Sequence, residues 1–117
     1  MQLKIKVRLF RVMLIYQGFK MERTQIQQII FNAIEMVNNL RDDDDQIPVS
    51  ESTELFGTNG HLDSMGLVGM LLDIEESMQD EGFEISLSDD RAMSQKNSPF
   101  INVNTLTAYI EMLLSGK

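Results

Sequence analysis

Residues 60–78 read GHLDSMGLVGMLLDIEESM, and the spacing of their apolar side chains predicts an amphipathic α-helix. Five apolar side chains recur at intervals of three and four residues and form one complete stripe, as expected for the helix face that packs on a core. They are Leu67, Met70, Leu71, Ile74 and Met78. The helix is expected to begin at Ser64, directly after Asp63, because short oxygen-bearing side chains satisfy the free amides of a first helical turn. We expect it to end at Met78 or Asp80.

The same helix carries a second apolar set that points away from the first. Its members repeat at i, i+3 and i+7: Met65, Val68 and Leu72. Three acidic residues with the same spacing flank it: Asp73, Glu76 and Asp80. A helix of a small bundle rarely needs two apolar faces. Either both faces are buried, or the second set is an exposed strip with an acidic border, which would suit docking to a partner protein with an apolar groove edged by Lys or Arg.

Two further amphipathic helices are predicted on either side of this one. The first begins with a capping box formed by Thr24 and Gln27 and ends near Leu40. Its apolar face consists of Ile26, Ile29, Ile30, Ala33, Ile34, Val37 and Leu40. The last helix is capped by Asn102. Its apolar side consists of Val103, Leu106, Ile110, Leu113 and Leu114.

The connections between these helices are long and polar. Residues 41–62 contain four consecutive aspartates and several turn-forming residues, and the apolar pair Leu55-Phe56 is expected to tuck against the helices. We interpret the aspartates as a solvated charge run. A short helix is predicted over residues 88–94. The fold class is therefore all-α, a small bundle of three main helices plus one short helix.

Composition excludes several classes of protein. The 117 residues make one domain, and the lack of Cys with a single His argues against a zinc or other metal site. No apolar run is long enough to span a membrane, so membrane partners are not expected. All 18 acidic residues lie in residues 21–117 with only five basic ones, a net charge of −13 for that region. So acidic a surface repels nucleic acid and attracts proteins with basic patches.

Residues 1–20 differ from the rest, because they carry five basic side chains, many apolar ones and no acid. Three interpretations remain open: an added strand or membrane-surface segment, a signal-peptide core, and an extension that precedes a true start at Met21. No small-residue cleavage motif follows the apolar run, which favours a cytoplasmic protein over a secreted one. We therefore divide the chain into a basic and apolar extension, 1–20, which the third interpretation places outside the functional domain, and a domain, 21–117.

The run LDSMGLVGMLLDIEESM, residues 62–78, resembles the modification site of acyl carrier proteins, whose hallmark is Asp-Ser-Leu at the start of the second helix. Here the motif stands as Asp63-Ser64-Met65. The resemblance extends over residues 22–114 and includes the first helix, the acidic loop, Phe83-Glu84-Ile85 and the closing NVNTLTAYIEML. Met65 departs from the usual Leu, and Gly66 and Gly69 stand where related carriers often have polar or acidic residues, which suggests a specialised member.

The resemblance implies an acyl-carrier-like bundle that is not an enzyme. Other enzymes would act on it at one serine. Ser64, preceded by Asp63, would receive 4′-phosphopantetheine from coenzyme A through a separate phosphopantetheinyl transferase. Its thiol would carry acyl groups between acyl-transferring or synthase enzymes of fatty-acid, lipid or polyketide-type synthesis, and we expect a monomer. Two alternatives stay open: a carrier of aminoacyl or peptidyl groups, and an unmodified helical interaction module. His61 is interpreted as a surface loop residue rather than a base.

Overall fold

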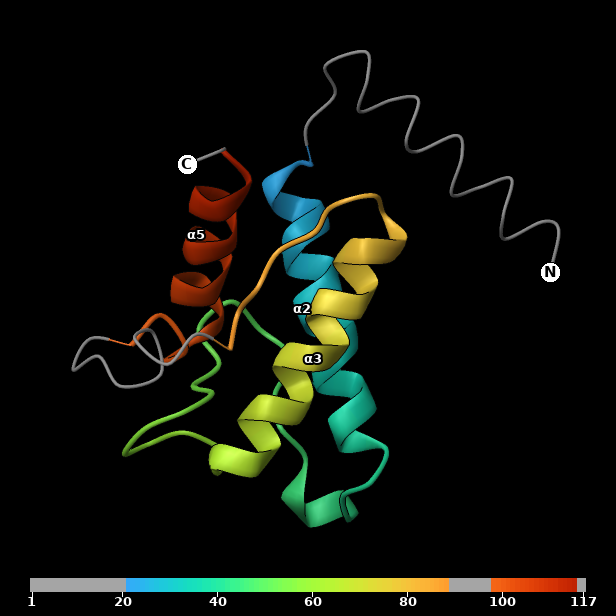
Figure 1. Ribbon diagram of the computed structural model, residues 1–117. Coiled ribbons are helices and arrows are strands. Elements are labelled where there is room, and N and C mark those ends of the chain that lie inside the picture. Colours follow the sequence, from blue (N-terminus) through green and yellow to red (C-terminus); the bar gives the residue numbers. More distant parts are fainter. Residues whose placement is uncertain (1–20, 89–97, 116–117) are drawn as a thin grey trace, which may run out of the picture.

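The structure, a computed structural model, describes residues 21–88 and 98–115, and this part of the chain is helical and contains no strand. It has three α-helices, α2 (Arg23–Asn38), α3 (Ser64–Asp80) and α5 (Val103–Leu114), and one short 3-10 helix, η1 (Asp43–Asp45) (Figure 1). The predicted all-α bundle of three main helices is thus confirmed. The extension of residues 1–20 and the predicted short helix lie outside the described residues, except that Ser88, its expected first residue, is not helical.

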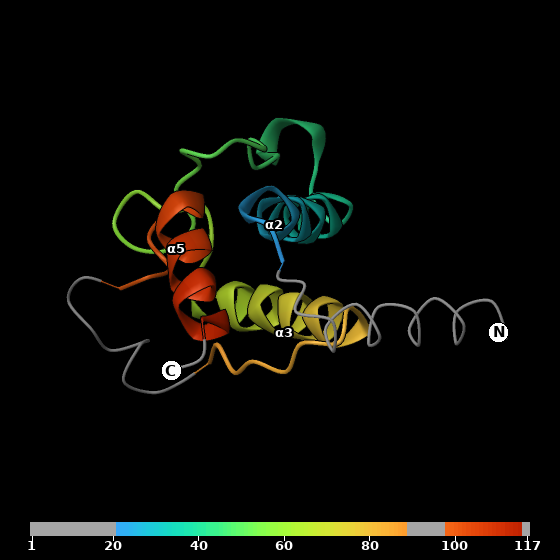
Figure 2. The same cartoon turned by 90° about the horizontal axis from the view of Figure 1, so that it is seen from above.

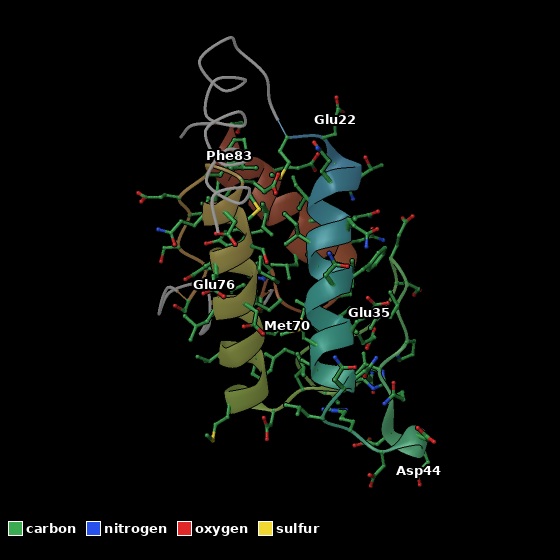
Figure 3. All side chains as sticks on the ribbon, turned by 90° about the vertical axis from the view of Figure 1, so that its right-hand side faces the viewer. Glu22, Glu35, Asp44, Met70, Glu76 and Phe83 are labelled. Atoms are coloured by element: carbon green, nitrogen blue, oxygen red, sulfur yellow. The ribbon has the colours of Figure 1, made fainter. Side chains whose placement is uncertain are left out.

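Helix α2 packs against both α3 and α5. Seen from above, α2 and α3 run side by side across the view, and α5 lies to one side of them (Figure 2). Helix α3 begins at the end of the bundle where α2 finishes, so Ser64 lies at the same end as η1 (Figures 1 and 3). This arrangement places the start of α3 among connecting loops rather than between helices.

The predicted core stripe of α3 is buried along its whole length: Leu67, Met70, Leu71, Ile74 and Met78. Met70 lies between α3 and α2, and Glu76 lies on the other side of α3 (Figure 3). The loops complete the core with five buried side chains: Ile47, Leu55, Leu62, Leu87 and Phe100. Leu55 is buried and Phe56 is partly buried against the core, as expected for the apolar pair.

Both ends of α2 differ from the prediction. The N-cap residue is Glu22, whose N–H donates to Gln25 Oε1 at 2.8 Å, so Thr24 lies inside the helix and does not cap it. Glu22 and Gln25 thus form the capping box that satisfies the free N–H groups of the first turn, two residues before the Thr24–Gln27 capping box that the sequence predicted. Leu40 is 91% exposed and belongs to no core face, because the helix has already ended at Asn38.

Asn38 explains where α2 ends. Its side-chain amide donates to Ile47 O at 2.9 Å and accepts from Ile47 N at 2.7 Å. This reciprocal pair ties the end of the helix to the loop and directs Ile47 into the core, where it is 1% exposed. The acidic run in between, which was expected to be loop throughout, forms the 3-10 helix η1 with all its side chains exposed.

The last helix begins as predicted. Asn102 Oδ1 accepts from Thr105 N at 2.8 Å, and Asn102 N donates to Thr105 Oγ1 at 3.1 Å, which completes a capping box. Residues 83–88 run beside α3 (Figure 2), where Glu75 Oε2 accepts from Leu87 N at 2.6 Å. No helix among residues 21–88 and 98–115 is long and apolar enough to cross a membrane.

Candidate functional site

The loop that leads into α3 is a tight turn closed by backbone contacts. Gly57 adopts a φ of +117°, a left-handed conformation suited to glycine, and Gly60 N donates to Gly57 O at 3.0 Å. Leu62 N then donates to Leu55 O at 2.8 Å, so the end of the loop lies beside the residue at which the loop starts. Because Leu55 and Leu62 are both buried, the two ends of the loop are anchored in the core.

Gly60 is required for this return. A Cβ atom there would lie 2.5 Å from Leu55 O and 2.6 Å from Phe56 Cα, closer than real Cβ atoms approach backbone. The backbone of Leu55 cannot easily move aside, because its N–H also donates to Ile101 O at 2.7 Å. The loop geometry before the predicted site therefore depends on a residue without a side chain.

Asp63 and Ser64 follow this loop at the start of α3. Asp63 is the N-cap residue, and its Oδ1 accepts from Gly66 N at 2.8 Å, as the sequence predicted for a helix start. Ser64 is the first helical residue, and its side chain is exposed. The cap thus fixes the first turn of α3 around Ser64 while leaving the serine hydroxyl accessible.

The backbone around Ser64 is suited to an anionic group. The amides of Gly66 and Leu67 donate to Asp63, but those of Ser64 and Met65 make no hydrogen bond within the described residues. Free N–H groups and the helix dipole at an exposed helix start favour a negative group by about 0.3–1 kcal/mol. A phosphodiester attached to Ser64 Oγ therefore fits this end of α3.

The second apolar set of α3 is exposed in the structure. Its exposed fractions are 85% for Met65, 36% for Val68 and 52% for Leu72, in contrast to the buried core stripe on the same helix. We call these three residues the apolar strip. It starts next to Ser64 and continues along α3. The alternative in which both faces of the helix are buried is excluded.

The acidic residues predicted to border the strip differ in exposure. Glu76 is exposed, and Asp73 and Asp80 are partly buried. Glu76 and Leu72 also line a surface hollow of about 480 Å³ that lies between α3 and residues 84–86. Two further carboxylates, Glu75 and Glu84, line the same hollow. Beyond Leu72, the apolar strip therefore meets an acidic depression that the helix spacing alone did not predict.

The glycines of α3 differ in their surroundings. A Cβ on Gly66 would lie 3.2 Å from Asp63 Oδ1 and 3.3 Å from Leu62 Cδ2, whereas a Cβ on Gly69 would meet nothing within 4 Å. A side chain at position 66 would thus crowd the Asp63 carboxylate that caps the helix, which explains the glycine there. No contact within the described residues requires Gly69, although glycine costs about 1 kcal/mol relative to alanine in a helix interior.

His61 and the acidic run make no catalytic arrangement with Ser64. The His61 side chain is exposed and makes no hydrogen bond within the described residues; its backbone carbonyl accepts from Arg41 Nη2 at 2.8 Å. No group of three or more His, Asp or Glu side chains in residues 21–88 and 98–115 is placed to hold a metal ion. The contact with Arg41 was not predicted, because twenty residues separate the partners and the acceptor is a backbone atom.

Comparison of the chain with protein-family models, with curated proteins and with solved structures finds no match.

Proposed function

We propose that this protein is an acyl carrier protein and is not itself an enzyme. Ser64 bears a 4′-phosphopantetheine arm, and the loaded arm serves enzymes of fatty-acid, lipid or polyketide-type synthesis. The observation that supports this most directly is an exposed serine at the first position of α3, fixed by the Asp63 cap and continued by an exposed apolar strip. A purely structural helix start does not need that strip.

Attachment of the arm uses the Ser64 hydroxyl as nucleophile. Ser64 Oγ attacks the phosphorus of coenzyme A that bears the pantetheine unit; one P–O bond forms to the serine, the pyrophosphate P–O bond breaks, and adenosine 3′,5′-bisphosphate leaves. The hydroxyl proton passes to a base of the transferase, since no described side chain is hydrogen-bonded to Ser64. The bound arm supplies a thiol that carries acyl groups as thioesters, chemistry that this Cys-free chain lacks.

The apolar strip and its acidic border define the partners that this surface would fit. Met65, Val68 and Leu72 would enter an apolar groove, and the carboxylates beyond them would face Lys or Arg side chains at its edge. The acidic charge of residues 21–117 would attract such partners at long range and raise the rate of encounter. A phosphopantetheinyl transferase and the acyl-transferring enzymes would share this surface.

The function is tested by co-expressing the full chain with a broad-specificity phosphopantetheinyl transferase. Intact-protein mass spectrometry should show the addition of a single arm. A chain that the transferase never modifies, although folded by circular dichroism, would contradict the carrier function. If that unmodified chain still binds a protein through the apolar strip, an unmodified interaction module becomes the better interpretation.

We expect that changing Asp73, Glu76 and Asp80 together to Lys slows turnover by the transferase about tenfold or more at low salt, because opposite charges steer the encounter. Helicity should stay unchanged, since none of the three side chains is fully buried. The defect should shrink in about 1 M salt, where the Debye length is about 3 Å. Turnover is measured as a function of salt concentration.

The matched control changes Asp42, Asp43 and Asp44 to Lys. These residues are exposed, belong to η1 or precede it rather than bordering the apolar strip, and alter the net charge by the same amount. The control should retain most of the wild-type turnover. Equal losses in the two triple variants would show that overall charge, and not the border of the apolar strip, governs the encounter.

A further inference from the structure

Arg41 connects three segments at the end of the bundle where Ser64 lies. It follows α2, and its Nη2 donates to His61 O at 2.8 Å. Its Nη1 donates to Asp45 O at 3.3 Å and lies 3.7 Å from Asp45 Oδ1. One guanidinium thus joins the end of α2, the acidic helix η1 and the loop that enters α3.

No other described side chain from outside residues 57–63 is hydrogen-bonded to that loop. The buried Leu55 and Leu62 anchor the loop on the side of the core, and the backbone contact from His61 N to Glu54 O is long, at 3.4 Å. On the side that faces the end of α2, the hydrogen bond from Arg41 holds the carbonyl three residues before Ser64. Together with the buried Leu62 and the Asp63 cap, this contact therefore contributes to holding the chain that leads into Ser64.

The chemistry of the contact requires arginine. A guanidinium presents five N–H donors in a rigid plane, so it can donate to two carbonyl oxygens in different segments at once. A lysine at the same position carries a compact ammonium group on a flexible stem. It can replace the charge and one hydrogen bond, but it does not hold both segments in a fixed relation.

We propose that Arg41 is a positioning residue for the modification of Ser64, acting by holding the loop that sets the direction of the first turn of α3. This inference rests on the proposed carrier function. Without the guanidinium the loop populates several arrangements, and the transferase binds only the fraction in which Ser64 is presented. The apparent affinity of the transferase for the carrier falls in proportion to that fraction, while the chemical step on the bound protein stays the same.

The test compares Arg41→Ala, Arg41→Lys and wild type in steady-state transfer from coenzyme A by a phosphopantetheinyl transferase. For Arg41→Ala we expect the KM for the carrier to rise about fivefold or more, the effect of losing one net hydrogen bond or more, with kcat within about twofold of wild type. The KM of Arg41→Lys should lie between the KM values of wild type and Arg41→Ala. A drop in kcat with unchanged KM, or a lysine variant no better than alanine, would overturn a positioning role.

The matched control is Arg23→Ala, at the opposite end of α2. Arg23 makes an ion pair with Glu111 and has no contact with the loop, so its removal deletes an arginine of the same helix region without touching Ser64. Its KM should equal that of wild type. An equal rise in KM for Arg23→Ala and Arg41→Ala would attribute the effect to general loss of positive charge.

Amide hydrogen exchange separates this inference from the proposed function, because it needs no transferase. In Arg41→Ala the amides of residues 61–66 that are protected in wild type should exchange about fivefold faster, whereas those of α5 should be unchanged. Unchanged exchange in residues 61–66 would refute the positioning role even if the carrier function holds. Faster exchange in a protein whose wild type is never modified would refute the carrier function alone.

Discussion

Replacing Ser64 by Ala should abolish attachment of the phosphopantetheine arm completely, whereas the wild-type chain gains one arm. Ser64 Oγ lies at the first position of α3, beside the apolar strip and two backbone amides that make no hydrogen bond within residues 21–88 and 98–115. Removing this oxygen removes the nucleophile, so no residual transfer is expected at any enzyme concentration. Intact-protein mass spectrometry of both chains after incubation with transferase and coenzyme A makes the measurement.

The loss should not reflect unfolding. The capping oxygen at this helix start belongs to Asp63, and alanine is a good helix former at the position that Ser64 occupies. We therefore expect the melting temperature of Ser64→Ala to stay within about 2 °C of wild type, a change of a few tenths of a kcal/mol. Ser77→Ala, which removes another exposed serine of α3, should be modified like wild type. Modification of Ser64→Ala, or its loss in Ser77→Ala, would mean that the site is elsewhere.

Replacing Gly60 by Ala should be the most destabilising change at the site, by about 3 kcal/mol, because the new Cβ would overlap backbone atoms. The nearest atoms are Leu55 O at 2.5 Å and Phe56 Cα at 2.6 Å, and Leu55 is held by hydrogen bonds on both sides. For a domain of this size that loss lowers the melting temperature by about 15 °C. Thermal and urea unfolding followed by circular dichroism measure it.

Gly69→Ala supplies the opposite control. A Cβ there would meet nothing within 4 Å, so alanine should stabilise α3 by about 1 kcal/mol through its higher helix propensity. The two glycine variants therefore shift the melting temperature in opposite directions. A Gly60→Ala protein that melts within about 2 °C of wild type would show that the loop before Ser64 adjusts freely, and that its geometry is not fixed by residues 55–62.

Much of the fold followed from helical periodicity in the sequence. Buried apolar residues recur every three or four positions, so the core stripe of α3 and the faces of α2 and α5 were predictable. The start of α2 was predicted wrongly, because Glu22 with Gln25 and Thr24 with Gln27 are similar local signals and only packing selects one of them. Leu40 fitted the period but lies beyond the point where Asn38 turns the chain to Ile47.

The candidate site was predictable only where its residues are close in sequence. Asp63, Ser64 and the apolar strip are linked by helical spacing, and the structure places them together at one end and along one face of α3. Arg41 lies twenty residues from the carbonyl that it binds, and no local pattern marks a backbone acceptor. Gly60 resembled an ordinary turn residue in sequence, since the close approach of Leu55 becomes visible only when the loop is closed.

The backbone link between the loop before α3 and the segment before α5 has a consequence for the order of folding. Leu55 and Phe56 donate to the carbonyls of Ile101 and Phe100, and Val103 donates to Thr53, so the link joins residues that are about two fifths of the chain apart. Closing so long a loop costs entropy before its contacts form, so we expect this link to form late, after α2 and α3 have paired. Pulse-labelling of amides during refolding should then show Leu55 and Phe56 protected together with α5. If the proposed carrier function holds, a nascent chain still lacking α5 would present Ser64 less well, and the transferase would modify mainly chains in which α5 has already been made and packed.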